Sequence, residues 1–441
     1  MNLRRYNGMK KEIGVVLEDT STGVGRAVRA CFEFCGGAKT LLKSSRDVYI
    51  KVNAVDLKKY CYTDPEVVRE TILYFKENGA RNIYVIENCT QGNFTRLVFK
   101  ATGITRICNE TGAVPVFLDE TEPIPVFLET LESFIDMSAF VFERLIKNRD
   151  ENLYVSLPKL KTHSMTQITL SIKNQFGLVH QNSRIADHNY RLHQKFADIY
   201  RVIRPDVALV DGIIATNHGH YIAESNRDRC VYPMNLLIAG TDPLAVDVVA
   251  SKLIGFSVKD VEHLNLCKDF GIGEGDIKKI SIHNSHLLRE RQQKLTYQLL
   301  EDFPADLKIL RGKTRCCKEG CRRNTETVVE VLHRDHGGRG GFTILMGKGI
   351  DPKEVKKITG RVHIAGGCAI EDYGLELVKR LGKKNVTMSA GCNNLADTLH
   401  GLCGHMKVSP LKLVPLNPLN SLLTLCTAKV KGTRAKIPPV L

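Results

Sequence analysis

The chain reads Leu-Tyr-Val-Ser-Leu-Pro-Lys-Leu-Lys-Thr-His at residues 153–163. The apolar run Leu153–Leu157 predicts a buried strand that ends at Pro158, because proline cannot donate a hydrogen bond to a sheet. Strands that alternate with helices predict an α/β fold, with a mostly parallel sheet and helices on both faces. Working outward, further apolar runs of strand length lie at residues 47–52, 82–86, 114–118, 207–210 and 236–238, with helical patterns such as 64–77 and 245–254 between them.

A group of cationic and polar residues follows the predicted strand 153–157. We expect this group to sit at one edge of the sheet, where lysine side chains bind a phosphate or a carboxylate. Taken singly, each residue could equally be a solvated group at a strand end. The candidate catalytic residues are Lys161, His163, Lys173 and Asp211, where Asp211 would handle protons. The candidate substrate-binding residues are Lys159, Thr162, Asn174 and Asp242.

Several of these segments resemble the family known as domain of unknown function 362, over about residues 13–285. The resemblance is carried by Val52-Asn53, residues 62–65, residues 157–163, Ser171-Ile172-Lys173-Asn174, Val210-Asp211-Gly212 and residues 240–247. It implies a pocket at the strand ends, to which Asn53 would contribute as a further substrate-binding residue. It also implies association with iron–sulfur modules, but it supplies no reaction. This chain lacks a Cys-x-x-Cys-x-x-Cys run, so a ferredoxin-type pair of clusters is not expected.

Cysteines concentrate in the last third of the chain. There are 14 in total, and a chain in a reducing compartment uses cysteine more often as a free thiol or a metal ligand than in disulfides. Two predicted strands are each followed by glycine and then cysteine, which puts thiols at neighbouring strand ends. Arg315, Lys318 and Arg322 flank another trio and favour thiolate. The sequence therefore predicts a metal or iron–sulfur site whose candidate ligands are Cys316, Cys317, Cys321, Cys368, Cys392 and Cys403.

Residues 361–425 carry a second resemblance, to a half-domain of the hybrid-cluster and carbon monoxide dehydrogenase proteins. It rests on Gly366-Gly367-Cys368, Tyr373, residues 386–392, residues 410–414, Asn417 and Asn420. In that family, cysteines at such strand ends hold iron–sulfur clusters, and Cys368 and Cys392 match two of the positions. A third cysteine is replaced here near Asn417, so Cys403, Cys426 or the trio at 316–321 would have to substitute for it.

A chain of 441 residues is long enough for two or three domains. We expect an α/β domain at 1–285, a helical connector at 286–305 and a smaller cysteine-rich α/β domain at 306–441. The preferred function is an iron–sulfur oxidoreductase that acts on a small anionic substrate and exchanges electrons with a redox partner protein. The alternative is a non-redox enzyme or binding module for a phosphorylated or carboxylated ligand, with structural zinc or free thiols.

Composition and charge restrict the classes of binding partner and the cellular compartment that we expect. The net charge is +15, but no nucleic-acid motif accompanies it, so a solvated basic surface is the preferred interpretation. No apolar run reaches the roughly 20 residues that cross a bilayer, and Met1–Lys11 has no apolar core typical of a secretory signal. We therefore expect a cytoplasmic protein without nucleic-acid or membrane partners. Abundant cysteine without tryptophan fits an anaerobe.

Overall fold

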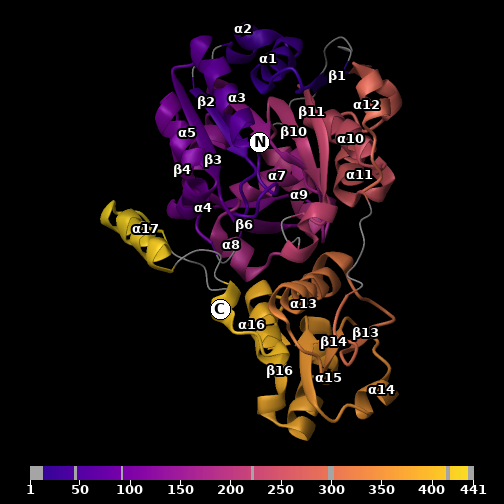
Figure 1. Ribbon diagram of the computed structural model, residues 1–441. Helices are drawn as coiled ribbons and strands as arrows, with labels where there is room; N and C mark the ends of the chain where they lie inside the picture. The colour runs from indigo at the N-terminus through magenta and orange to yellow at the C-terminus, as the bar shows by residue number, and fades with distance from the viewer. Residues whose placement is uncertain are drawn as a thin grey trace.

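The computed structural model describes residues 13–43, 47–90, 93–219, 223–295, 302–413 and 418–435. Its larger sheet has ten strands, eight of which follow one another in the order β12-β1-β11-β10-β7-β2-β3-β4 (Figure 1). These strands are β1 (Ile13–Asp19), β2 (Asp47–Val52), β3 (Asn82–Glu87), β4 (Val114–Phe117), β7 (Asn152–Leu157), β10 (Val207–Thr216), β11 (Val231–Gly240) and β12 (Ile280–His283). The two others, β8 (Lys159–His163) and β9 (Gln167–Ile168), extend it beside β10.

Helices cover both faces of this sheet, and alternate residues of each strand enter the two cores. Val48 and Ile50 of β2 face one core, and Tyr49 faces the other, as the two-residue period of a strand requires. The first core packs against α1 (Val24–Phe34), α3 (Pro65–Glu77), α4 (Thr95–Ala101) and α5 (Ile104–Thr111). The second packs against α7 (Leu170–Asn174), α9 (Leu192–Val202), α10 (Pro243–Leu253) and α11 (Glu262–Asp269). The predicted fold class is confirmed.

The structure refines three local predictions. The helix expected at 64–77 begins at Pro65, and its cap is Asp64, whose carboxylate accepts a hydrogen bond from Glu66 N at 2.9 Å. The lysine segment was expected at the carboxyl end of the strand 153–157, and there residues 159–163 form a further buried strand, β8, beyond the break at Pro158. The strand expected at 236–238 is the longer β11, which runs antiparallel to both of its neighbours, β1 and β10.

A second sheet of four parallel strands lies below the first in Figure 1. Its strands stand in chain order as β13 (Lys308–Arg311), β14 (Phe342–Met346), β15 (Arg361–Ala365) and β16 (Val386–Ser389). It also has two cores, one against α13 (Arg323–His336) and α16 (Leu395–Met406), the other against α14 (Pro352–Lys356) and α15 (Gly367–Leu381). We call the two parts the first and the second domain.

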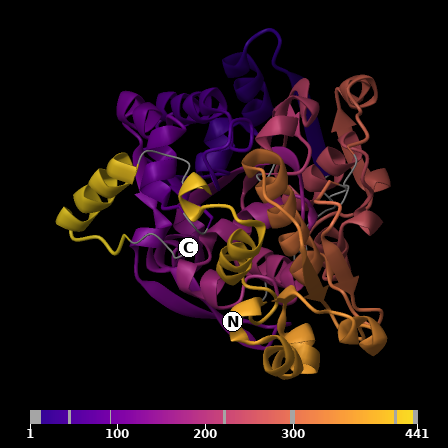
Figure 2. The ribbon, with the colours of Figure 1, turned by 60° about the horizontal axis from the view of Figure 1, so that its bottom comes forward.

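Two segments at the edges of the second domain differ from expectation. The connector was predicted to be helical over 286–305, but α12 (Ser285–Glu290) ends early, and residues 296–301 lie outside the described part. The last helix, α17 (Pro418–Val430), contacts α4 of the first domain and stands apart from the second sheet (Figures 1 and 2). Other elements are α2 (Gly37–Leu42), α6 (Ala139–Val141), α8 (Gln181–Ala186), the hairpin of β5 (Pro123–Leu128) and β6 (Ser133–Ser138), and several short 3-10 and π turns.

Candidate functional site

A pocket with a cavity volume of about 70 Å³ lies between the two domains. We call it the interdomain pocket. The first domain lines it with the carboxyl ends of β2 and β3, the end of β8, α7 and α8, and the second domain adds Asn324 and Leu395. Its polar lining residues include Lys51, Asn53, Glu87, His163, Lys173, Asn174 and Arg184. Four candidate residues from the sequence therefore line it: Asn53, His163, Lys173 and Asn174.

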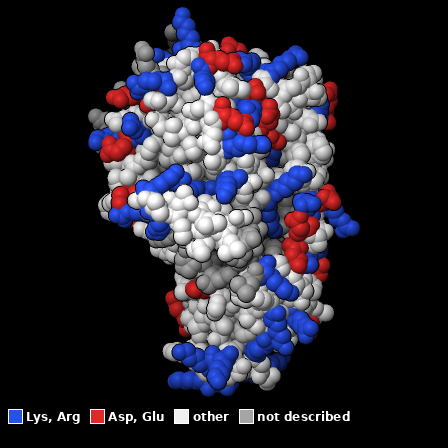
Figure 3. Space-filling view, turned by 60° about the vertical axis from the view of Figure 1, so that its left-hand side comes forward, with Lys and Arg blue, Asp and Glu red and all other residues white. Residues whose placement is uncertain are grey.

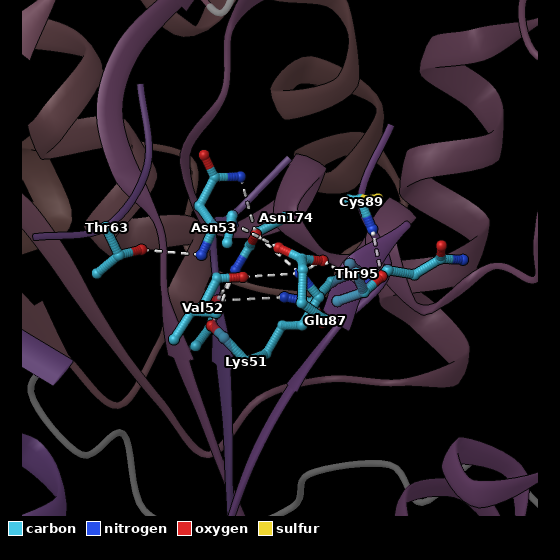
Figure 4. A network of polar contacts seen from close by, with 12 residues as sticks. Lys51, Val52, Asn53, Thr63, Glu87, Cys89, Thr95 and Asn174 are labelled. Atoms are coloured by element: carbon cyan, nitrogen blue, oxygen red, sulfur yellow. Dashed lines mark hydrogen bonds and ion pairs between the residues drawn. The ribbon is translucent and has the colours of Figure 1, made fainter. Parts of the chain in front are cut away.

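A buried ion pair forms the floor of the interdomain pocket (Figure 4). Lys51 Nζ lies 2.5 Å from Glu87 Oε1, and both side chains are almost fully buried. The ammonium also donates to Val52 O at 2.8 Å and Asn174 Oδ1 at 3.2 Å. Burial lowers the pKa of Lys51, and the attraction of Glu87 opposes that shift. Glu87 therefore keeps a charged lysine in place where water cannot solvate it.

Glu87 and the neighbouring amides organise the rest of the floor. The second carboxylate oxygen, Glu87 Oε2, accepts from Ala54 N at 2.7 Å, while Glu87 Oε1 also accepts from Asn88 N at 2.8 Å. Asn53 Nδ2 donates to Asn174 Oδ1 at 3.2 Å. Among the described residues, Asn53 Oδ1 and Asn88 Oδ1 are buried without a hydrogen-bond partner. Buried acceptors of this kind are costly unless something donates to them, so both oxygens are suited to a ligand hydroxyl.

Lys173 reaches the pocket from α7 and is half-buried there. Its Nζ lies 5.6 Å from the centre of the Phe196 ring, and no hydrogen bond or ion pair involves this amine within the described ranges. Burial lowers the pKa of Lys173 well below the ordinary value, and the cations Lys161, Arg184 and Lys51 lower it further. Lys173 is thus a poorly solvated amine that lines the interdomain pocket. Its protonation depends on the charge of the molecule that binds beside it.

The short helix α7 is held by a residue that sequence reasoning did not select. Asp247 of α10 is fully buried, and its two carboxylate oxygens accept from Ser171 N and Ile172 N, each at 2.8 Å. These bonds satisfy the first amides of α7 and so fix the direction in which Lys173 and Asn174 project. Burial raises the pKa of Asp247 to about 8, and the two backbone donors oppose that shift. Asp247 acts on the pocket through α7.

Five of the predicted site residues lie outside the pocket lining: Lys159, Lys161, Thr162, Asp211 and Asp242. Lys159 Nζ pairs with Asp211 Oδ2 at 2.7 Å, and the same oxygen accepts from Asp64 N at 2.7 Å. Asp211 is therefore engaged in binding the start of α3 and is not placed to handle a proton in the pocket. Lys161 donates to Cys61 O at 2.5 Å, and burial lowers its pKa to about 8. Thr162 donates to Asn217 Oδ1 at 2.8 Å.

Asp242 is separated from the lysines by the direction of its strand. Because β11 is antiparallel to β10, the residues after β11 lie at the opposite edge of the sheet from the pocket. There Asp242 caps α10, accepting from Leu244 N at 3.0 Å and Glu274 N at 3.0 Å. The expectation that Asp242 binds substrate beside the lysines does not agree with this placement.

His163 ends β8 and lines the pocket, with its Nδ1 accepting from Met165 N at 3.2 Å. A second histidine, His188, was not selected from the sequence. Burial and Arg184 lower the pKa of His188 to about 3, so this imidazole is neutral. It donates from Nδ1 to Asn189 Oδ1 at 2.6 Å. His188 can therefore offer a neutral imidazole to a bound molecule.

Four of the six candidate metal ligands gather in the second domain: Cys317, Cys321, Cys368 and Cys392. We call them the four-thiol cluster. Burial raises the pKa of Cys321 to about 12, and the thiols of the other three members contribute to that shift because they lie close by. Burial, Asp187 and two cluster thiols likewise raise the pKa of Cys392. Arg315 Nε donates to Cys317 Sγ at 3.1 Å.

A glycine turn brings these thiols together. Gly366 caps α15 with φ 88° and ψ 150°, and it donates to Ser389 O at 2.9 Å in the next strand. A Cβ at Gly366 would lie 2.4 Å from Cys321 Sγ, so the sulfur packs directly on this backbone. Cys368 follows in the first turn of α15, beside the N–H groups at the start of that helix.

The two other predicted ligands are placed differently. Cys403 lies in a hydrophobic core on α16, and burial alone raises its pKa to about 11. Cys316 packs against the same core, as Cys321 does, and burial raises its pKa to about 11. Its thiol also lies near that of Cys321, since it too raises the pKa of Cys321. Among the residues that the structure describes, no three His, Cys, Asp or Glu side chains lie as they would around a bound metal ion.

Cys392, one member of the four-thiol cluster, lines a second pocket that adjoins the interdomain pocket. The residues that flank Cys392 also line this second pocket, and it shares Arg184, His188, Asn189 and Leu395 with the first. Asn189 of the first domain donates to Cys392 O at 2.9 Å and to Asn393 O at 3.2 Å. The cysteine turn of the second domain therefore docks against the edge of the lysine-containing pocket of the first.

Several residues important to this geometry were missed because their roles arise only on folding. Glu87 ends a predicted strand, and a lone acidic residue there is usually solvated. Arg184 belongs to a short polar segment, yet it is buried and donates to Asn88 O at 3.0 Å and Cys89 O at 2.9 Å. Asp247 lies in a segment that carried the family resemblance, and that position was the one signal that could have selected it.

Comparisons with known proteins support the family resemblance for the first domain. Residues 48–252 match the family described as Domain of unknown function (DUF362). The Thylakoid-associated protein sll1697 of Synechocystis is 25% identical over 238 residues, which cover 52% of this chain and 69% of that protein. The lactate racemase apoprotein of Thermoanaerobacterium thermosaccharolyticum is a structural neighbour with a TM-score of 0.38 and 11% identity, covering 91% of this chain and 84% of that one. Over the described residues, no helix is long and apolar enough to cross a membrane.

Proposed function

We propose that this protein is an iron–sulfur oxidoreductase that binds a small hydroxylated anion in the interdomain pocket. One observation carries the proposal: the pocket that holds Lys173 and the pocket that holds Cys392 share four lining residues. A molecule bound beside Lys173 would thus lie in a pocket that adjoins the pocket of Cys392, one of the four thiols. The proposal also draws on the resemblance of residues 361–425 to cluster-binding half-domains, which remains a hypothesis.

The anion-binding side rests on the charge of the interdomain pocket. Lys51 is neutralised by Glu87, which leaves Arg184 and the partly exposed Lys173 as the cations that a ligand would meet. The orphan acceptors Asn53 Oδ1 and Asn88 Oδ1 favour a ligand that also carries a hydroxyl donor. A small hydroxycarboxylate or a phosphorylated polyol meets both requirements, and the cavity of about 70 Å³ favours the smaller one.

The donor chemistry of the four-thiol cluster fits an iron–sulfur cluster. Four cysteines are the usual ligand set, and Cys317, Cys321, Cys368 and Cys392 supply that number from three separate turns. The absence of paired Cys-x-x-Cys spacings argues against a structural zinc ion. When bound, such a cluster would supply one-electron transfer. Arg315 and the amides at the start of α15 would offset negative charge on the thiolates.

The chain's own residues would bind and orient the substrate. The carboxylate or phosphate would lie between Lys173 and Arg184, while a hydroxyl would donate to Asn53 or Asn88. His163 and the neutral imidazole of His188 line the same space and would contact the bound molecule. The electrons would be exchanged with a redox partner protein, which we expect to dock near the second domain.

Anaerobic purification tests the cluster directly. The wild-type protein should be brown and contain iron and acid-labile sulfide, and Cys392→Ser should lose most of both. Cys426→Ser is the matched control, because Cys426 is exposed on α17 and lies outside the four-thiol cluster. Visible absorption and metal analysis of the three proteins are the measurements. A colourless wild type with a single zinc ion would support the alternative of structural zinc, and one without any metal would contradict both.

Anion binding should be coupled to proton uptake by Lys173. Neighbouring cations and burial lower the pKa of Lys173, and a bound anion offsets both effects, so the lysine takes up a proton on binding. Affinity should consequently fall as pH rises, by up to about tenfold per pH unit. Titration calorimetry with glycolate and acetate, in buffers of different ionisation enthalpy, measures the proton uptake. Glycolate should bind more tightly because its hydroxyl can donate to the orphan amide oxygens.

Two variants test whether Lys173 is the group that takes up the proton. Lys173→Met should remove the proton uptake and weaken binding of both anions. Lys252→Met should leave the uptake intact, because Lys252 is exposed on α10 and lies outside the pocket lining. Proton uptake that persists in Lys173→Met would contradict the assignment, as would equal binding of glycolate and acetate.

A further inference from the structure

The last helix, α17, presents an apolar stripe to solvent. Leu419, Leu422, Leu423, Cys426 and Val430 recur at spacings of three, four and seven residues, which places them on one helix face. The leucines are 66%, 56% and 65% exposed, Val430 is 88% exposed, and Cys426 is exposed as well. A helix on the surface of a globular protein normally turns such a stripe toward the core.

The opposite face of α17 carries the small residues that pack on the protein. Thr424 is 7% exposed and Ala428 is fully buried, while α17 contacts α4 of the first domain. The usual amphipathic arrangement is therefore inverted, with small side chains inside and large apolar ones outside. Exposing several leucines together is unfavourable in water, so this face is suited to an apolar environment.

The orientation of α17 is held at its carboxyl end. Arg434 N donates to Glu120 O at 3.4 Å, and the Arg434 guanidinium forms an ion pair with Glu122. Ala435, the next residue, is fully buried. These contacts tie the chain after α17 to the first domain, beside which the helix lies (Figures 1 and 2). The exposed leucines therefore belong to the surface of the protein.

Basic side chains accompany the stripe. Lys429 and Lys431 lie at the end of α17 and are exposed, and Lys100 is exposed on α4, which α17 contacts. Figure 3 shows lysine and arginine side chains beside an uncharged projection on this side of the molecule. The whole chain carries a formal charge of +15. An apolar stripe with a cationic border is the pattern of helices that lie in the interface of an anionic membrane.

We propose that α17 is an interfacial anchor that docks this protein on an anionic lipid surface. Leu419, Leu422, Leu423 and Val430 would enter the acyl boundary, and Lys429 and Lys431 would meet the lipid headgroups. Such binding would lie along the membrane surface and would not cross it, in keeping with a helix of 13 residues. It departs from the expectation, drawn from the absence of a long apolar run, that the protein has no membrane partner.

A lipid surface fits this face better than a protein partner does. A second copy of the chain would bring the same basic border into contact, and like charges would repel. The stripe also lacks the aromatic and arginine anchors that dominate protein interfaces. Binding to an anionic lipid surface requires apolar side chains that enter the acyl region and cationic side chains that contact the headgroups, and α17 has both.

Flotation of the full-length protein with lipid vesicles tests the proposal. The protein should float with phosphatidylglycerol–phosphatidylcholine vesicles, bind pure phosphatidylcholine much less, and lose affinity as salt is raised. The triple variant Leu419→Ser, Leu422→Ser, Leu423→Ser should bind at least about tenfold more weakly, since three leucine side chains that would be buried in the lipid are lost. Leu375→Ser is the matched control: Leu375 is 81% exposed on α15 and stands apart from the stripe, so binding should not change.

Light scattering on the same proteins separates the alternatives. A wild-type protein that does not bind the anionic vesicles would overturn the proposal. A wild-type dimer that the triple variant converts to a monomer, without vesicle binding, would assign the stripe to a second copy of the chain. Circular dichroism should show the triple variant folded, because the changed side chains are exposed. The outcome is independent of iron content, so it does not depend on the function proposed above.

Discussion

Replacing Glu87 by glutamine is expected to lower the free energy of unfolding by about 3–5 kcal/mol, the usual cost of removing one partner of a buried ion pair. Lys51 Nζ lies 2.5 Å from Glu87 Oε1, and neither side chain is reached by solvent. Glutamine keeps the shape of the side chain but not its charge. The lysine must then either stay charged without a counter-ion or release its proton. Urea denaturation at neutral pH, followed by circular dichroism, measures the change.

An exposed pair provides the control for this prediction. Arg29 and Glu77 lie 2.6 Å apart, but their side chains are 46% and 51% exposed. Glu77→Gln should therefore cost no more than about 1 kcal/mol. The double variant Lys51→Met, Glu87→Gln should recover part of the loss, because it removes the unpaired charge. Equal effects of Glu87→Gln and Glu77→Gln would show that the floor of the pocket is open to water.

Replacing Gly366 by alanine is expected to destabilise the second domain by about 2–5 kcal/mol, from backbone strain and overpacking together. The φ of 88° and ψ of 150° at Gly366 belong to a region that glycine alone adopts readily. The added methyl would also meet Cys321 Sγ at 2.4 Å. The thiol would have to leave its position, so we also expect less bound iron. Thermal unfolding and iron analysis are the measurements.

Two further variants separate strain from overpacking. Gly391→Ala is the control for strain, because Gly391 has φ 56° and nothing within 4 Å of an added Cβ. Its cost should be about 1 kcal/mol, as for a residue forced into the left-handed region. Adding Cys321→Ala to Gly366→Ala should relieve the clash, leaving Gly391 O as the nearest atom at 3.7 Å. A double variant that is no more stable than the sum of its single changes predicts would contradict direct sulfur–glycine packing.

Local pattern was sufficient for most elements of the fold. The predicted strand at 47–52 coincides with β2, and that at 361–365 coincides with β15. The glycine–cysteine turns were expected at the ends of neighbouring parallel strands, and Gly366 and Gly391 are found there beside β15 and β16. These predictions succeed because the apolar period and the turn residues report which face of an element is buried, and that is a property of the element itself.

The candidate site was only partly predictable. Lys173, Asn174, His163 and Asn53 meet in one pocket, while Lys159 and Asp211 pair with each other and Asp242 lies at the far edge of the sheet. The sequence contained every one of these charges but not the direction of β11, which separates Asp242 from the lysines. Strand direction depends on pairing between residues far apart in the chain, and no local period reports it.

The sequence by itself determined the α/β architecture, the lysine segment and the cysteine-bearing turns, because each depends on a short run of side chains. The tertiary structure alone decided that Glu87 neutralises Lys51, that Asp247 directs α7, and that the pocket of Cys392 adjoins the pocket of Lys173. It also decided that α17 leaves its own domain and turns leucines to solvent. Those outcomes depend on contacts between residues that are far apart in the chain, and such contacts form only when the whole chain folds.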